Sequence, residues 1–74
     1  MKRQLTLLGV QYADGRTGHV ECVILTDRQA RTLDRLYRRW EDGADGNLFR
    51  QAATSFADIG ARKLGVARYG EICY

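Results

Sequence analysis

The sequence predicts a single α+β domain: an N-terminal β-hairpin, a long amphipathic helix, a second helical region and a short C-terminal strand. Three observations point to this class. An Asp-Gly pair separates two apolar segments near the N-terminus, an apolar stripe at helical spacing runs through residues 26–42, and a second one follows residue 47. The 74 residues fit one compact domain, 1–74, without a linker. The expected order of elements is ββααβ.

The composition is that of a folded protein with a mild basic excess. Hydrophobic residues make up 45% and charged residues 28%, which excludes a disordered chain, and the net charge is +3 with ten arginines against two lysines. Arginine suits phosphate and carboxylate partners, although a GC-rich coding sequence would favour it too. A chain this short buries only about 60% of its unfolded surface. An enclosed active site would compete with that small core, so we expect no enzyme activity and no cofactor.

The segments around Asp14-Gly15 predict the hairpin. Residues 5–10 and 19–25 are apolar and β-branched, as strands are. A two-residue turn would place three cross-strand pairs on one apolar face: Leu5 with Ile24, Leu7 with Cys22, and Gly9 with Val20. A longer loop with a bulge at Thr17-Gly18 is the competing geometry.

Residues 26–42 predict the long helix. Thr26 and Gln29 have the spacing of a capping box, Leu25 and Ala30 that of a hydrophobic staple, and Gly43 suits the left-handed residue that ends a helix. The apolar stripe should cover the apolar face of the hairpin. It comprises Ala30, Leu33, Leu36, Tyr37 and Trp40.

A second helical region is expected from Asn47 to about Lys63, capped by Asp45 or Asn47 and stopped at Gly65. Gly60 is a poor helix residue, so two short helices with a break near Thr54 are the alternative. Residues 66–74 then predict a third strand, split by Gly70. A Cys22–Cys73 disulfide would require this strand to lie beside the second one.

The candidate binding site is the face of the long helix opposite its apolar stripe. Five arginines fall within an arc of about 100° there: Arg28, Arg31, Arg35, Arg38 and Arg39. They could bind phosphates or an acidic protein patch. The competing interpretation is a solvated face balanced by acids four residues away, as Asp34 is from Arg38. Four further residues form a secondary candidate set: Lys2, Arg3, Tyr12 and Arg68.

Two further patterns in the sequence concern DNA binding and metal binding. Residues 25–29 and the Ala61-x-x-x-Gly65 spacing resemble helix-turn-helix proteins, which would imply a DNA-reading helix after Gly65, but only nine residues follow it. His19, Cys22 and Cys73 could supply three zinc ligands. However, strand alternation points His19 and Cys22 to opposite faces, and no fourth ligand is evident. We therefore expect no metal site.

These features predict a small, non-enzymatic regulator or inhibitor whose arginine face docks onto an acidic surface of a larger complex. Proteins of this kind are often made by phages and mobile elements, and RNA polymerase or a nucleic-acid-guided defence effector would be typical targets. The alternatives are direct RNA or DNA binding by the same arginines and a small structural dimer subunit. With no secretory signal, no membrane-spanning segment and two cysteines that suit reduced thiols, we expect a cytoplasmic monomer or homodimer.

Overall fold

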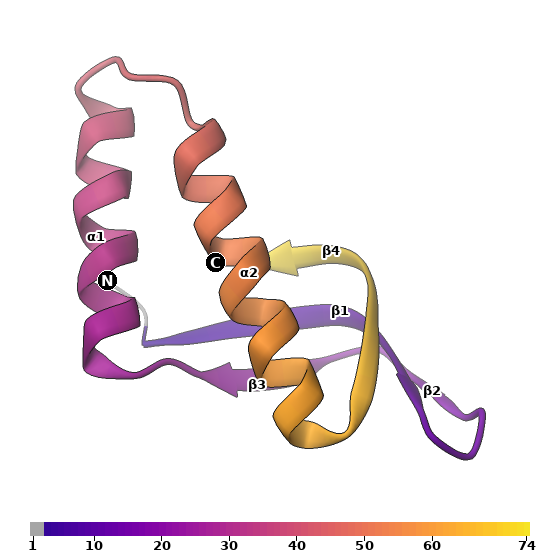
Figure 1. Cartoon of the computed structure of the whole chain (residues 1–74). Helices are drawn as coiled ribbons and strands as arrows, with labels where there is room; N and C mark the ends of the chain where they lie inside the picture. The colour runs from indigo at the N-terminus through magenta and orange to yellow at the C-terminus, as the bar shows by residue number, and fades with distance from the viewer. Residues whose placement is uncertain (1–2) are drawn as a thin grey trace.

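The computed structural model describes residues 3–74 and has the α+β architecture that the sequence predicts. In chain order the elements are β1 (Gln4–Tyr12), β2 (Thr17–Gly18), β3 (Glu21–Ile24), α1 (Asp27–Glu41), α2 (Asn47–Leu64) and β4 (Val66–Cys73). All strand pairs are antiparallel. β1 pairs with β2 and β3 along one edge and with β4 along the other, so the first strand is central. Figure 1 shows this arrangement, with both helices on one side of the sheet.

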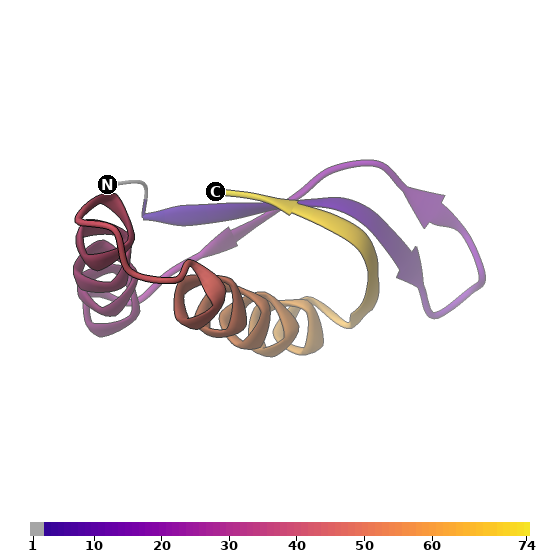
Figure 2. The same cartoon turned by 90° about the horizontal axis from the view of Figure 1, so that it is seen from above.

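The molecule is two layers thick, with Cα extents of 43 × 22 × 15 Å. Figure 2 shows the helices on one face of the sheet, and within residues 3–74 no element covers the other face. The helix α2 covers the sheet, while α1 packs mainly against α2 and stands at the end of the sheet. Our prediction that α1 would cover the hairpin is therefore wrong, because α2 occupies that face.

α2 lies close to the sheet because its inner face consists of small residues. Ala53, Ala57 and Ala61 recur every four residues and are buried, and Gly60 faces Val23 at a distance that leaves no room for a Cβ atom. The helix is continuous, so the alternative break near Thr54 is wrong. Gly60, which appeared to be a weak helix residue, is what allows the close approach of helix and strand.

The hairpin has a longer loop than the two-residue turn that we predicted. The backbone N–H of Tyr12 donates to the carbonyl of Arg16, and three residues lie between them, with Gly15 at φ +90°. Leu5 consequently pairs with Val23, not with Ile24. This one-residue shift buries Val23 and leaves Cys22 and Ile24 exposed, so the predicted apolar face of the second strand is wrong.

The helix ends were predicted correctly except for the N-terminus of α2, where Gly46 is the N-cap and no side chain caps the helix, so the predicted cap by Asp45 or Asn47 is wrong. Thr26 and Gln29 form the reciprocal capping box at the start of α1, and Gly43, at φ +101°, follows its C-terminal end. Asp45 accepts a hydrogen bond from the backbone N–H of Asn47, and Gly65 ends α2 in the left-handed conformation.

The chain after Gly65 forms the strand β4 and not a further helix. A helix-turn-helix is therefore excluded, since its recognition helix would have to occupy these residues. Gly70, at φ +77°, opens a bulge in β4: Gly70 and Glu71 together face the single residue Leu8 of β1. Among residues 3–74, no helix has both the length and the apolar content that crossing a bilayer requires.

Candidate functional site

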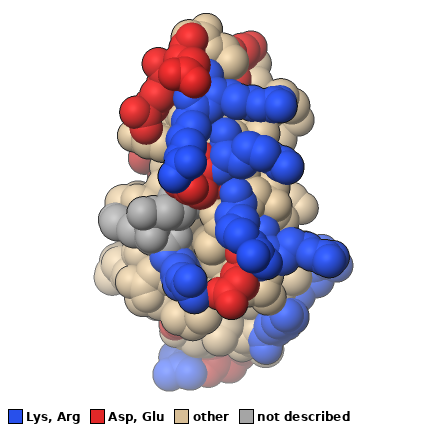
Figure 3. Space-filling model, turned by 90° about the vertical axis from the view of Figure 1, so that its left-hand side faces the viewer, with Lys and Arg blue, Asp and Glu red and all other residues tan. Residues whose placement is uncertain are grey.

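The five arginines of α1 all lie on the solvent-exposed side of the helix. α1 is the outermost element of the fold, so this side faces away from both α2 and the sheet (Figure 1). In Figure 3 the basic side chains form a ridge along this side of the molecule. We call this surface the arginine face; it consists of Arg28, Arg31, Arg35, Arg38 and Arg39. From the first to the last of them the helix rises about 16 Å.

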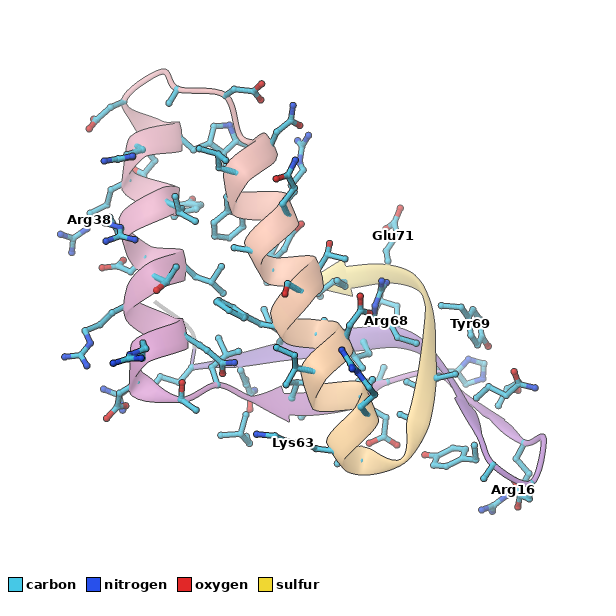
Figure 4. The ribbon with its side chains drawn as sticks, in the orientation of Figure 1. Arg16, Arg38, Lys63, Arg68, Tyr69 and Glu71 are labelled. Carbon is cyan, nitrogen blue, oxygen red and sulfur yellow. The ribbon has the colours of Figure 1, made fainter. Side chains whose placement is uncertain are left out.

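Within residues 3–74, most of these guanidinium groups have no ion-pair partner. Arg38 is bound to Asp34 of the preceding turn, with 3.2 Å between nitrogen and oxygen, and its side chain extends away from the fold (Figure 4). No carboxylate of the described chain lies within ion-pair distance of Arg28, Arg31, Arg35 or Arg39. Asp27 is four residues before Arg31, but it pairs with Arg3 at 2.5 Å and leaves Arg31 unbalanced.

An acidic stripe borders the arginine face. Asp27, Asp34 and Glu41 are seven residues apart and so lie on one line along α1, between the arginines and the apolar stripe. Two of these three carboxylates are in the ion pairs just described. A partner that covers both stripes must therefore place its negative charges selectively, opposite the arginines.

The secondary candidate residues do not gather around the arginine face. Arg3 lies beside the start of α1 through its pair with Asp27, whereas Tyr12 donates its hydroxyl hydrogen to Glu21 in the hairpin. Arg68 binds Asp58 of α2 at 2.8 Å and the carbonyl of Gly70. Figure 4 places Arg68 on the sheet side of α2, far from Arg38. Lys2 lies outside the described residues.

An aromatic groove on the inner side of α1 was not predicted. Its volume is about 390 Å³, and its aromatic lining comes from α1, α2 and the C-terminus. The rings meet edge to face: the Tyr37 and Phe49 centroids are 5.7 Å apart, and those of Phe49 and Tyr74 are 4.9 Å apart. We expected Tyr37 to be buried, but it is 43% exposed at the edge of this groove. The aromatic rings are Tyr37, Trp40, Phe49 and Tyr74.

The part of the chain that the structure describes holds no grouping of three His, Cys, Asp or Glu side chains suited to a metal ion. β4 pairs with β1 and not with β3, so Cys22 and Cys73 lie on opposite sides of Thr6, and both are free thiols. The hydrogen bond to Glu21, together with partial burial and the nearby carboxylate charge, raises the pKa of Tyr12 above its usual value of 10.0.

Comparison with protein-family models, with curated proteins and with solved structures gives no match to this chain. The case for function therefore rests on the surfaces described above.

Proposed function

We propose that this protein is a non-enzymatic interaction module that binds an acidic protein surface through the arginine face of α1. The observation that carries this proposal is the row of five guanidinium groups on the outermost helix, of which only that of Arg38 has an ion-pair partner within residues 3–74. α1 does not need this row for its own stability, because its capping box and apolar stripe act elsewhere on the helix. Guanidinium groups form bidentate, charge-assisted hydrogen bonds with carboxylates, so an acidic patch is a natural counterpart.

The surroundings of the arginine face favour protein over nucleic acid. The carboxylates of the neighbouring acidic stripe would repel a continuous line of phosphates, whereas a protein can place single carboxylates opposite single arginines. The rings of Tyr37 and Trp40 lie toward α2 and the aromatic groove, which Arg38 borders at its edge, so within residues 3–74 they do not form a platform for bases along the row of arginines. The partner would be a larger complex that this small chain regulates or inhibits, of the class of RNA polymerase or a nucleic-acid-guided defence effector.

Direct binding of RNA or DNA is the second candidate. It is favoured by the outermost position of α1, which would let a single helix enter the major groove of a duplex. The two candidates differ in their response to salt. Phosphate binding weakens linearly on a log–log plot as counterions are released, while a protein interface retains the part of its affinity that comes from apolar contacts.

The test is affinity capture from a bacterial lysate, with and without nuclease, using the wild type and the Arg31→Glu/Arg35→Glu variant. Each Arg→Glu change removes two units of charge, so this variant goes from +3 to −1. Arg62→Glu/Lys63→Glu at the end of α2 makes the same change away from the arginine face and is the matched control. We expect the wild type and the control to capture a protein complex that survives nuclease treatment. The Arg31→Glu/Arg35→Glu variant should bind this complex with at least about tenfold lower affinity.

Two results would contradict the proposal. If the α1 variant folds and captures the same complex as the wild type, the arginine face is not the binding site. If capture depends on intact nucleic acid and an oligonucleotide binds with a steep salt dependence, the second candidate replaces the first.

A further inference from the structure

The face of the sheet opposite the helices is apolar where an exposed face is usually polar. Antiparallel sheets with one face in water normally place polar residues on that face. Here the outward positions include Leu8, 44% exposed, Ile24, 74% exposed, and Tyr69, 50% exposed. We call this surface the open face; its central residues are Thr6, Leu8, Cys22, Ile24, Tyr69 and Cys73.

The open face carries no formal charge over its central residues, although charged residues make up 28% of the chain. The neighbouring outward positions are also neutral, with Gln4 opposite Ile24 and Gln11 opposite Ala67. Glu71 is the nearest acid on β4, and it projects at the outer edge of the sheet where Gly70 opens the bulge (Figure 4). Exposed apolar surface of this kind, bordered by polar groups, typically marks an interface.

We propose that the open face is the interface between two copies of this chain, packed sheet against sheet about a two-fold axis that passes near Thr6. A neutral surface offers a charged foreign partner nothing to pair with, but two identical neutral surfaces meet without repulsion. The arginine face lies on α1, away from the open face, so the positive charges of the two copies stay apart (Figures 1 and 2). A two-fold interface needs a self-complementary patch. Cys22 and Cys73 flank Thr6 on its two sides, so a two-fold axis along β1 near Thr6 places Cys22 of each copy opposite Cys73 of the other.

The size of the open face is sufficient for such a dimer. Strands lie about 4.8 Å apart and rise about 3.3 Å per residue, so β1, β3 and β4 together cover roughly 330 Å² per copy in projection. With the relief of its side chains, a pair of such faces buries roughly 950 Å², which is the size of a weak, concentration-dependent interface. The resulting dimer carries two arginine faces on its outside, which would raise its avidity for a partner with repeated acidic patches.

The first experiment measures the mass of the full chain in solution, under reducing conditions, by light scattering and sedimentation from micromolar to millimolar concentration. The wild type should reach twice its monomer mass of 8.4 kDa. Ile24→Glu on the open face should remain monomeric, and Thr6→Lys at its centre should do the same. Leu48→Glu is the matched control, because Leu48 is 58% exposed on α2 and gains the same charge as Ile24.

Circular dichroism establishes that each variant is folded. A wild type that stays at the monomer mass over the whole range would overturn the proposal. A dimer that persists in folded Ile24→Glu and Thr6→Lys would also overturn it, since the interface would then lie elsewhere.

Disulfide cross-linking gives an independent measurement. Cys22 and Cys73 lie on the two strands that flank β1, so their Cα atoms are about 9.6 Å apart, beyond the reach of a disulfide within one chain. Mild oxidation should therefore produce a covalent dimer of the wild type. Oxidised Ile24→Glu should produce at least tenfold less. Equal yields from both proteins would mean random collision and would contradict a dimer through the open face.

Discussion

Gly60 of α2 packs directly on Val23 of β3, so closely that a Cβ atom on residue 60 would overlap Cγ1 of Val23. This contact brings the helix layer down onto the sheet. Replacing glycine by alanine in a helix normally stabilises it by about 1 kcal/mol. Here we expect Gly60→Ala to destabilise the protein by roughly 1–2 kcal/mol, because forcing an extra methyl into a packed core costs about 1–3 kcal/mol.

Urea unfolding followed by circular dichroism measures this effect. The Val23→Ala/Gly60→Ala double variant is the control: the smaller side chain makes room for the new methyl, so Gly60→Ala should cost less in that background. A gain in stability from Gly60→Ala in the wild-type background would show that α2 does not lie as close to β3 as described.

The capping box of α1 makes a prediction that depends on local structure. The Thr26 hydroxyl accepts a hydrogen bond from the backbone N–H of Gln29 at 3.1 Å, so Thr26→Ala should cost about 1 kcal/mol. Thr32→Ala is the matched control, because Thr32 lies in the middle of the same helix and its hydroxyl donates to the carbonyl of Arg28. That bond competes with helix geometry, so its loss should be neutral or slightly stabilising. Equal losses of unfolding free energy in the two variants would contradict the assignment of Thr26 as the cap.

The features that sequence could predict are those that depend on neighbouring residues. Thr26 with Gln29 and the glycines at 43 and 65 define helix ends through hydrogen bonds within a few residues. The exposure of the five arginines followed from helical spacing for the same reason. Ion pairs were less predictable, because Asp27 is equally able to reach Arg31 along the helix or Arg3 across to the N-terminal segment.

The strand register could not be predicted because the segment from Cys22 to Leu25 is apolar at both alternate sets of positions. Either Val23 or the pair Cys22 and Ile24 could face the core. Packing against α2 determines the register, because Gly60 leaves space for the side chain of Val23. The open face was missed as a consequence, since two of its residues had been assigned to the core. A signal was present in the small residues of α2, which indicate a helix that packs closely on another element.

The hydrogen bond from Tyr12 to Glu21 predicts a pH dependence of stability. Because this bond raises the pKa of Tyr12 in the folded protein, the folded state holds the phenol proton more tightly than the unfolded state. The contribution of Tyr12 is therefore fully present below the unfolded pKa, near 10, and is lost as pH rises through the higher folded pKa. The wild type should lose stability above about pH 10 relative to Tyr12→Phe.

Thermal unfolding at a series of pH values from neutral to alkaline measures this difference. Glu21→Gln provides the control, because it removes the carboxylate charge while keeping an acceptor for the phenol hydrogen. The change in stability that Tyr12→Phe produces at alkaline pH should be smaller in the Glu21→Gln background than in the wild-type background. A difference that does not change with pH would show that the phenol does not interact with Glu21 in solution.

The ion pair between Arg68 of β4 and Asp58 of α2 should stabilise the fold more than the pair between Arg16 and Asp14, although the latter is shorter, at 2.6 Å against 2.8 Å. Arg68 has a side chain only 18% exposed and joins two elements, whereas Arg16 is 75% exposed in the hairpin loop. Asp58 is 47% exposed, so solvent screening limits the effect. Double-mutant cycles to alanine should give a coupling of about 1 kcal/mol for Arg68 with Asp58 and about 0.3 kcal/mol for the loop pair. The reverse order would mean that distance, and not burial, determines the strength of these pairs.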